Sequence, residues 1–288
     1  MRLVISHHPG GAELISNYIN SKKIKCEFLL SGPSKKIFKK NLKKVKKFDS
    51  GNLKKDLSNI KEVFFSSGVE NEFEMKYLNF FKKKKIKTIT FIDHWAYYKE
   101  RFKYKKKYIF PDEIWTSDKY AFQKAKKIFN SEIKLIKNFF LEKFKKNYSK
   151  YNKSKKYLLF VSQPLKEQNS FWKEKINYDQ FQAFYFFLKN KNLIKFNSKK
   201  ILIKLHPLEY PKNWKELKIF KSSEKDFKIT KNQNLPLLFS KAEAVIGCGS
   251  TLMAISSLLN IKTFCAIPPK GKKNNLPFKK IKYLRQLK

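Results

Sequence analysis

The chain has 288 residues, a formal net charge of +43 and 42% hydrophobic residues, including 28 phenylalanines. It can therefore bury the core of one large or two modest domains, and its composition is not that of a disordered chain. The charge suggests nucleic-acid binding, but only three of the 66 basic residues are arginines (Arg2, Arg101 and Arg285), and the lysines are spread along the whole length. Because arginine is preferred for bidentate recognition of phosphates and bases, we interpret the lysines as a solvated surface and expect no nucleic-acid partner.

Strand-like and helix-like segments alternate from one end of the chain to the other. Short apolar runs that end in polar or glycine residues predict strands at 3–5, 27–30, 62–65, 86–92, 113–116, 133–136, 157–161, 200–205, 226–229, 244–246 and 263–266. Helical spacing predicts helices at 12–19, 34–42, 70–81, 118–129, 181–188, 235–240 and 251–259. This alternation is typical of parallel sheets with helices on both faces.

Residues 145–156 are rich in lysine, asparagine, serine and tyrosine without an apolar period, and we predict a linker or an exposed connection there. We therefore expect an α/β fold of two Rossmann-like units, over residues 1–150 and 151–288, that face a cleft suited to a ligand. The regular pattern is expected to end at the proline-rich residues 268–271.

Targeting and metal-binding patterns are missing from the sequence. The N-terminus predicts a strand rather than a signal peptide, and no apolar run approaches the roughly 18 residues that span a bilayer. The three cysteines lack disulfide or zinc spacing, and HxxxH, paired DxD, CxxC and GxSxG motifs are absent. We expect a cytoplasmic protein without a metal or other cofactor, whose cationic surface favours peripheral contact with the cytoplasmic membrane.

Every histidine of the chain lies just after a predicted strand. These residues are His7, His8, His94 and His206. Open α/β sheets bind ligands outside the carboxyl ends of their strands. Pro207 holds His206 in an extended conformation and so fixes where its imidazole points. His206 would neutralise charge on a leaving phosphate, the alternative being an ordinary strand-terminating turn.

A glycine turn follows a later strand. Gly247 and Gly249 would let the backbone approach an anion, and the helix that starts near Ser250 offers free N–H groups and a positive dipole end. Ser250 and Thr251 would add hydroxyl donors. The alternative is a tight strand-to-helix turn in which Ser250 is the N-cap.

The turn after the first strand also contains glycines. Gly10 and Gly11 would bring the first helix close to a ligand near His7 and His8, without the spacing of a dinucleotide fingerprint. Glu13 is expected in the first helical turn, near the positive end of the helix dipole.

The segment from Asp93 to Arg101 combines an acid, an imidazole, aromatic rings and a mid-chain arginine. Asp93 would be the general base for an acceptor hydroxyl, and Trp95 would stack on a sugar, with His94 beside it. The alternative is a capped helix with amphipathic aromatic residues.

Three further acids follow the third predicted strand. Glu70 is a second candidate base, whereas Glu72 and Glu74 are expected at the surface.

Two groups of motifs resemble those of known families. Lys204-Leu205-His206-Pro207 and Ser250-Thr251 resemble the His-Pro and Ser-Ser/Thr motifs of bacterial sialyltransferases and polysialyltransferases. The other group looks like uncharacterised bacterial polysaccharide-biosynthesis proteins of similar length and comprises Phe91 to Trp95, Tyr98, Arg101-Phe102 and Pro111 to Trp115.

The first resemblance implies a metal-independent GT-B-fold enzyme that uses a CMP-activated sugar. By that resemblance, His206 contacts the donor phosphate, with Ser250 and Thr251 beside it. The family's base lies in an acid-acid-glycine motif that this chain lacks, so Asp93, Glu70 and Glu13 are its stand-ins.

The sequence thus predicts a glycosyltransferase of surface polysaccharide or glycolipid assembly, with the nucleotide sugar on the C-terminal unit and the acceptor on the N-terminal unit. One alternative is a nucleotide-sugar epimerase or hydrolase on the same fold. Another is a non-enzymatic polyanion-binding protein, which the scarcity of arginine disfavours.

Overall fold

The computed structural model describes all residues except 54, 70–71, 167–175, 223–225, 232–233, 275 and 288. The chain forms two compact units, Met1–Lys143 and Phe144–Lys288. The division lies inside helix α5 (Phe139–Ser149), whereas the sequence pattern predicts it after residue 150.

The first unit is built on a parallel sheet of six strands in its described residues, in the order β2-β1-β3-β4-β7-β8. The strands are β1 (Arg2–Ser6), β2 (Glu27–Leu30), β3 (Glu62–Phe65), β4 (Lys87–Ile92), β7 (Glu113–Thr116) and β8 (Glu132–Leu135). The helices are α1 (Pro9–Lys22), α2 (Ser34–Asn41), α3 (Glu72–Lys83) and α4 (Lys119–Ile128). Short additional elements are the hairpin of β5 (Lys103–Tyr104) with β6 (Lys107–Tyr108) and the 3-10 helices at Ser50–Asn52, Leu57–Asn59 and Glu100–Phe102.

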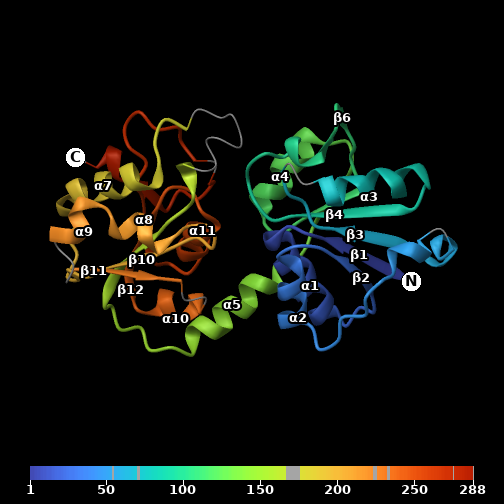
Figure 1. Cartoon of the computed structure of the whole chain (residues 1–288), viewed down its shortest axis with the longest axis horizontal. Helices are drawn as coiled ribbons and strands as arrows, with labels where there is room; N and C mark the ends of the chain where they lie inside the picture. The colour runs from blue at the N-terminus through green and yellow to red at the C-terminus, as the bar shows by residue number, and fades with distance from the viewer. Residues whose placement is uncertain are drawn as a thin grey trace. The chain divides into compact units, whose positions relative to one another are not determined.

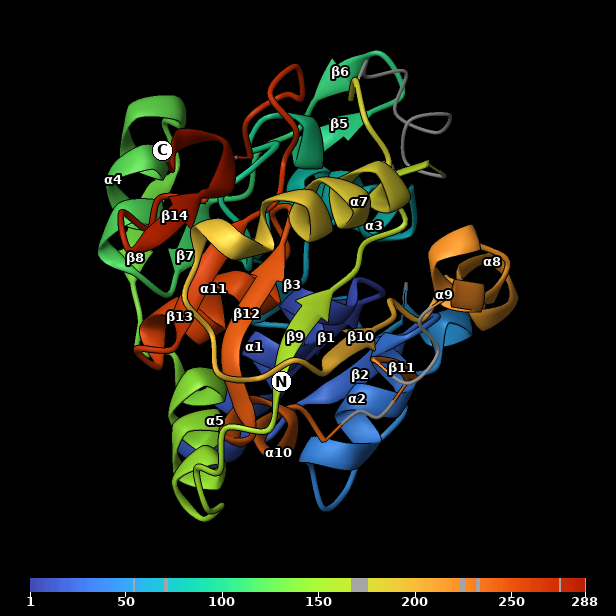
Figure 2. The ribbon, with the colours of Figure 1, turned by 90° about the vertical axis from the view of Figure 1, so that its left-hand side faces the viewer.

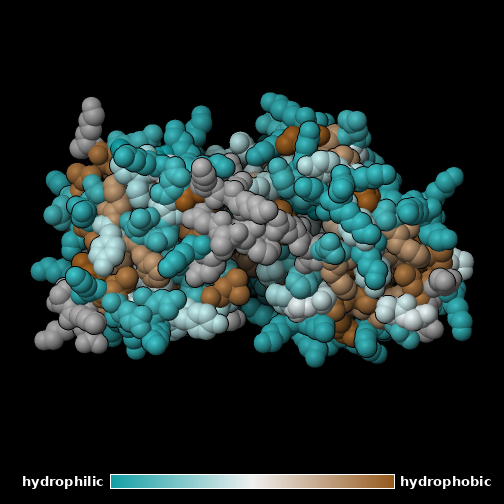
Figure 3. Space-filling model, turned by 45° about the horizontal axis from the view of Figure 1, so that its top comes forward, coloured by the Kyte–Doolittle hydropathy of each residue, from teal (hydrophilic) through white to brown (hydrophobic). Residues whose placement is uncertain are grey.

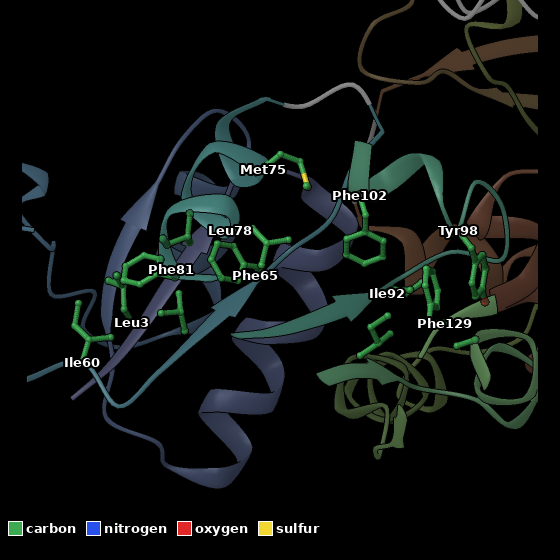
Figure 4. Packing of buried hydrophobic residues seen from close by; sticks show 14 of the residues in the cluster. Leu3, Ile60, Phe65, Met75, Leu78, Phe81, Ile92, Tyr98, Phe102 and Phe129 are labelled. Carbon is green, nitrogen blue, oxygen red and sulfur yellow. The ribbon is translucent and has the colours of Figure 1, made fainter. Parts of the chain in front are cut away.

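The core of this unit lies on both faces of the sheet because nearly every side chain of its central strands is buried. Leu3 and Ile5 of β1 pack into one cluster, and Val4 between them packs into the other. Figure 1 shows α1 and α2 on one face of the sheet and α3 on the other. Figure 4 shows the cluster beneath α3, where Phe65 from β3 lies beside Leu78 and Phe81. Burial on both faces is what parallel strands require.

The second unit is also built on a parallel six-stranded sheet in its described residues, in the order β11-β10-β9-β12-β13-β14. The strands are β9 (Tyr157–Val161), β10 (Ile201–Lys204), β11 (Phe227–Thr230), β12 (Ala242–Gly247), β13 (Lys262–Cys265) and β14 (Ile281–Tyr283). The helices are α7 (Gln180–Asn190), α8 (Pro211–Lys215), α9 (Lys218–Ser222), α10 (Leu235–Ser240) and α11 (Thr251–Leu258), with 3-10 turns at Lys191–Leu193 and Leu284–Gln286. Figure 2 shows these strands side by side with α7 in front of them.

Aromatic rings fill the core on one side of this second sheet. Phe184 of α7 lies 5.0 Å from Phe160 of β9 and 5.4 Å from Trp214 of α8, measured between ring centroids. All three rings, Phe160, Phe184 and Trp214, are fully buried. Edge-to-face packing therefore holds α7 and α8 in addition to the burial of apolar surface.

Two predictions of the sequence pattern differ from the structure. Residues 145–149 continue α5, so the segment is not an irregular linker, although it is largely exposed and adjoins the division between the units as the alternative of an exposed connection predicts; Phe144 packs 5.7 Å from Phe239 on its apolar side. The regular structure also does not end at 268–271, since β14 pairs with β13 and buries Ile281. A three-residue strand is too short for its apolar run to stand out.

The surface is dominated by polar side chains. Figure 3 shows hydrophilic residues over most of the face in view. Within the described residues, no helix combines the length and the apolar character needed to cross a bilayer.

Candidate functional site

Polar residues gather at the carboxyl edge of each sheet, next to the point where the strand order reverses. The chain turns from β2 back to β3 on the other side of β1, and from β11 back to β12 on the other side of β9. Ligands of open α/β sheets bind in the crevice at such a switch point. His7 and His8 follow β1, His94 is the second residue beyond β4, and His206 is the second residue beyond β10. The strand-end placement of all four histidines is therefore confirmed.

In the first unit, a buried glutamate ties together the loops after β1 and β3. Oε1 of Glu74 accepts hydrogen bonds from the backbone N–H groups of His7 (2.9 Å) and His8 (3.1 Å) and from the hydroxyl of Ser66. The Ser66 hydroxyl also lies 2.8 Å from that of Ser6 at the end of β1. We call Glu74 with these donors the Glu74 network. It fixes the backbone of both loops at the switch point.

Glu74 is almost fully enclosed. Its side chain is 3% exposed, and its Oε2 atom has no hydrogen-bond partner among the described residues. A cavity of about 10 Å³, also lined by Thr90 and Arg101, adjoins it and is the size of one water molecule. Burial raises the pKa of Glu74 to about 7, although its three donors oppose that rise. The expectation that Glu74 lies at the surface is wrong, because it shares the core face of α3 with Met75 and Leu78.

Asp93 and Arg101 form an ion pair whose side chains are 9% and 4% exposed. Nη1 of Arg101 lies 2.8 Å from Oδ1 of Asp93 and also donates to the carbonyl oxygen of Ser67 at 2.8 Å. Its Nε donates to the carbonyl oxygen of Ala96 at 3.3 Å, and the side chain is only 4% exposed. Burial acts to raise the pKa of Asp93, but Arg101 and two nearby histidines hold it below its ordinary value. Asp93 is thus ionised and weakly basic, and the guanidinium of Arg101 is already engaged by the chain itself.

The glycines after β1 make room for the chain's own side chains. A Cβ atom on Gly10 would lie 1.7 Å from Oδ2 of Asp93, and one on Gly11 would lie 2.5 Å from Cβ of Ser66. Their role in approaching a substrate stays a prediction. The same Oδ2 atom of Asp93 is 3.5 Å from Nδ1 of His8, so Gly10 lets carboxylate and imidazole meet at the start of α1.

The other predicted residues of the first unit have structural partners. Glu13 lies beyond the first turn of α1, which has no acid, so that expectation is wrong; α1 begins earlier than predicted, at Pro9. Its Oε2 accepts from the side-chain amides of Asn41 (2.7 Å) and Asn17 (3.2 Å). His7 packs over Gly32, whose φ of +52° needs a glycine. Glu70 lies outside the described residues.

The segment after β4 forms bends and a short 3-10 helix, not a longer capped helix. Trp95 is 7% exposed, and its indole N–H donates to Oδ2 of Asp118, the N-cap of α4. Nδ1 of His94 accepts from the N–H of Ala96 at 3.2 Å, and burial lowers the pKa of His94 to about 4, so the ring is neutral at pH 7. Stacking of a sugar on Trp95 stays a prediction.

In the second unit, Glu209 ties together the loops after β9 and β10. Its Oε1 accepts from the hydroxyl of Ser162 (2.7 Å) and from the indole N–H of Trp214 (3.2 Å). Its Oε2 accepts from the backbone N–H of His206 at 2.8 Å, and the residue is 3% exposed. We call this set the Glu209 network. Nδ1 of His206 accepts from the N–H of Leu208 at 3.3 Å, which leaves the proton of the neutral ring on Nε2.

The glycine turn lies on the other side of β9, at the end of β12. A Cβ atom on Gly247 would lie 2.8 Å from Cγ2 of Val161, so this glycine allows the ends of β12 and β9 to approach closely. Ser250 is the N-cap of α11 and accepts from the N–H of Leu252 at 3.0 Å. Gly249 packs against Asn274, whose amide donates to the carbonyl oxygen of Cys248 at 2.7 Å. The N-cap interpretation of Ser250 is confirmed; a role of Ser250 and Thr251 in binding phosphate stays a prediction.

Sequence reasoning missed both buried glutamates. The signal for Glu74 is its spacing of four residues from Leu78 and seven from Phe81, which places it on the apolar face of α3. The signal for Glu209 is weaker, since it is only an acid three residues after His206 in a chain where acids are scarce.

No family model matches the sequence, and a search of curated proteins finds no match. Similar solved structures exist. S. aureus MnaA, solved with UDP, has a TM-score of 0.61, covers 92% of this chain and 79% of its own, and is 8% identical. The UDP-GlcNAc 2-epimerase of Methanocaldococcus jannaschii has a TM-score of 0.57 over 92% of this chain and 83% of its own at 14% identity. The glycosyltransferase of kitacinnamycin has a TM-score of 0.55 over 96% and 81% at 6% identity.

These likenesses confirm the predicted fold class, α/β with two Rossmann-like units of the GT-B type. None of the three is a sialyltransferase by its description, and that resemblance stays a prediction.

The contact between Gly10 and Asp93 predicts that Gly10→Ala destabilises the first unit. The new Cβ atom meets a carboxylate that Arg101 holds in place, so we expect a loss of about 2 kcal/mol in the free energy of unfolding, although alanine favours helices. Urea denaturation measures it. Gly51→Ala is the matched control, because its Cβ atom has no neighbour closer than 3.4 Å, and we expect a change within about 0.5 kcal/mol. Equal stability of the Gly10→Ala protein and wild type would contradict the packing.

The raised pKa of Glu74 predicts a particular pH dependence of stability. Since the folded-state pKa is about 7 and the ordinary value is 4.5, the folded state keeps a proton that the unfolded chain releases. The free energy of unfolding should therefore fall by roughly 3 kcal/mol as the pH rises through this window. Glu74→Gln removes this component, as seen by urea denaturation between pH 5 and about pH 8. The exposed Glu72 on the same turn is the control, since Glu72→Gln should keep the wild-type slope.

Proposed function

We propose that this chain is a glycosyltransferase that takes a sugar from a nucleotide-activated donor and transfers it, without a metal ion, to a glycan or glycolipid acceptor of surface-polysaccharide assembly. The donor binds at the carboxyl edge of the second sheet, and the acceptor binds at that of the first.

The observation that carries this proposal is the pair of turns on either side of β9. The His206 turn follows β10, and the Gly247 to Thr251 turn follows β12, so they flank the switch point of a sheet with Rossmann strand order. Two strand spacings separate them, about 10 Å, which suits the phosphates and sugar of one nucleotide sugar. The N-terminus of α11 supplies a positive dipole end there.

His206 has the hydrogen-bond polarity that a phosphate ligand requires. Because its Nδ1 accepts from the backbone, its Nε2–H is a donor, and the Glu209 network holds the loop that carries it. During transfer, the bond between the anomeric carbon and the phosphate oxygen breaks, and that oxygen takes the electron pair. Nε2–H and the helix N–H groups stabilise the charge that develops on it.

A second candidate is a nucleotide-sugar epimerase. It is favoured by the likeness to S. aureus MnaA with UDP and to the epimerase of Methanocaldococcus jannaschii, each of which covers 92% of this chain. The two candidates also differ in nucleotide, since the sequence resemblance implies a CMP-sugar and these neighbours point to UDP. They differ in product as well: a transferase releases nucleotide in the presence of an acceptor, whereas an epimerase returns a nucleotide sugar of changed configuration.

The donor site is tested by calorimetric titration of CMP, CDP, UDP, GDP and TDP at moderate salt. We expect one nucleotide to bind selectively and His206→Ala to weaken its affinity about tenfold, the value of one hydrogen bond to a charged group. Lys212→Ala is the matched control, because it removes an exposed charge on the neighbouring helix α8 and should leave affinity unchanged.

Uniform weak binding that salt abolishes and His206→Ala leaves unchanged would show that the lysine surface alone responds to anions, and the proposal would fail. Where one nucleotide is selected, phosphorus NMR of its sugar conjugate, with and without acceptor glycans, separates nucleotide release from epimerisation.

A further inference from the structure

Three side chains of the first unit form a continuous line of polar contacts from the core to the surface. Arg101, 4% exposed, pairs with Oδ1 of Asp93 at 2.8 Å. Oδ2 of the same carboxylate lies 3.5 Å from Nδ1 of His8. His8 is the outermost member, with 35% of its side chain exposed.

The imidazole of His8 has a defined orientation. Nδ1 is buried and has no hydrogen-bond partner among the described residues, and Oδ2 of the Asp93 carboxylate lies 3.5 Å from it. Cδ2 packs against Gly68, since a Cβ atom on that glycine would lie only 2.7 Å from it. This side of the ring is therefore closed. The exposed edge is therefore the one that carries Nε2. The backbone beneath is fixed, because the N–H of His8 belongs to the Glu74 network.

Burial and the nearby cationic groups keep the ring of His8 neutral. Burial lowers the pKa of His8, as do Arg101 and His7, while Asp93 opposes them. His94 faces the same carboxylate, and Glu74 lies beneath the loop. At neutral pH, a ring with its proton on Nδ1 next to Asp93 would present the lone pair of Nε2 to solvent.

We propose that His8 is the general base that takes the proton from the acceptor hydroxyl, and that Asp93, held by Arg101, is the positioning residue that sets its tautomer. This inference rests on the transferase function proposed above. The acceptor O–H bond breaks and its proton goes to Nε2 of His8. The oxygen forms a bond to the anomeric carbon, and the bond from that carbon to the donor phosphate breaks with its electrons on the phosphate oxygen.

This assignment replaces Asp93 as the base for two physical reasons. One oxygen of Asp93 is paired with a guanidinium and the other lies against the first turn of α1, so neither is open to an acceptor. A carboxylate whose pKa is held low also takes a proton poorly. Glu74 has the better pKa for the task, but it is 3% exposed beneath the loop.

The tautomer is testable on the free protein, without any substrate. The chain has four histidines, so two-bond nitrogen–proton correlation spectra resolve every imidazole, and His8→Gln assigns the signal of His8. At pH 7.5 we expect His8 to be neutral with its proton on Nδ1, whereas His206 and His94 carry theirs on Nε2. A His8 ring with its proton on Nε2 would overturn the proposal.

The base role is tested with two kinds of acceptor, of which only one must lose a proton to react. Transfer from the nucleotide sugar selected by calorimetry is measured to p-nitrophenyl glycosides, which must lose a proton, and to azide, which has none to lose. We expect His8→Gln to lower kcat toward the glycosides by about 100-fold or more, with transfer to azide within about twofold of wild type. Asp93→Asn should lower kcat by about tenfold toward the glycosides only.

Calorimetry on the same proteins separates the two hypotheses. Nucleotide binding that His8→Gln leaves intact, together with unchanged transfer to the glycosides, would refute the base and keep the transferase. An equal loss with azide and glycosides would mean that His8 only holds the loop. Absence of nucleotide binding by wild type would refute the transferase itself and with it the base that depends on it.

Discussion

A buried glutamate that binds two strand-end loops at once is the constraint on which both candidate sites depend. In each unit, one carboxylate accepts from a serine hydroxyl after one strand and from the backbone N–H of a histidine after the neighbouring strand. Parallel strands alone fix where each loop starts, not how its first residues turn. A carboxylate accepts hydrogen bonds from several donors at once, so it can hold both loops together beyond the last hydrogen bonds between the strands.

This device suits a chain with few acids and many lysines. The sequence holds 23 acidic residues against 66 basic ones, so most lysines remain without a carboxylate and stay in water. Glu74 and Glu209 are buried instead, and the side chain of Asp93 is only 9% exposed, so N–H, hydroxyl and guanidinium donors replace most of their hydration. The cost of burying an anion is visible in Glu74, whose pKa rises, and is offset in Asp93, where Arg101 keeps the pKa low.

Much of the fold could be predicted because buried parallel strands are local apolar runs; the bounds of β2, β3, β7 and β9 match those expected. The strand-end histidines and the Ser250 cap are equally local. Strand order is not, because it depends on which runs pair across the sheet. The sequence therefore located His8, Asp93 and Arg101 as members of one region but not their mutual contacts. It also placed Glu74 at the surface, since only the packed face of α3 shows which side is buried.

Both glutamate networks hold the histidine loops through main-chain N–H groups rather than through the imidazole rings. Every amino acid except proline offers the same donor. The course of each loop therefore does not depend on the imidazole it carries, and a substitution of the ring that keeps the backbone N–H leaves the glutamate contact in place.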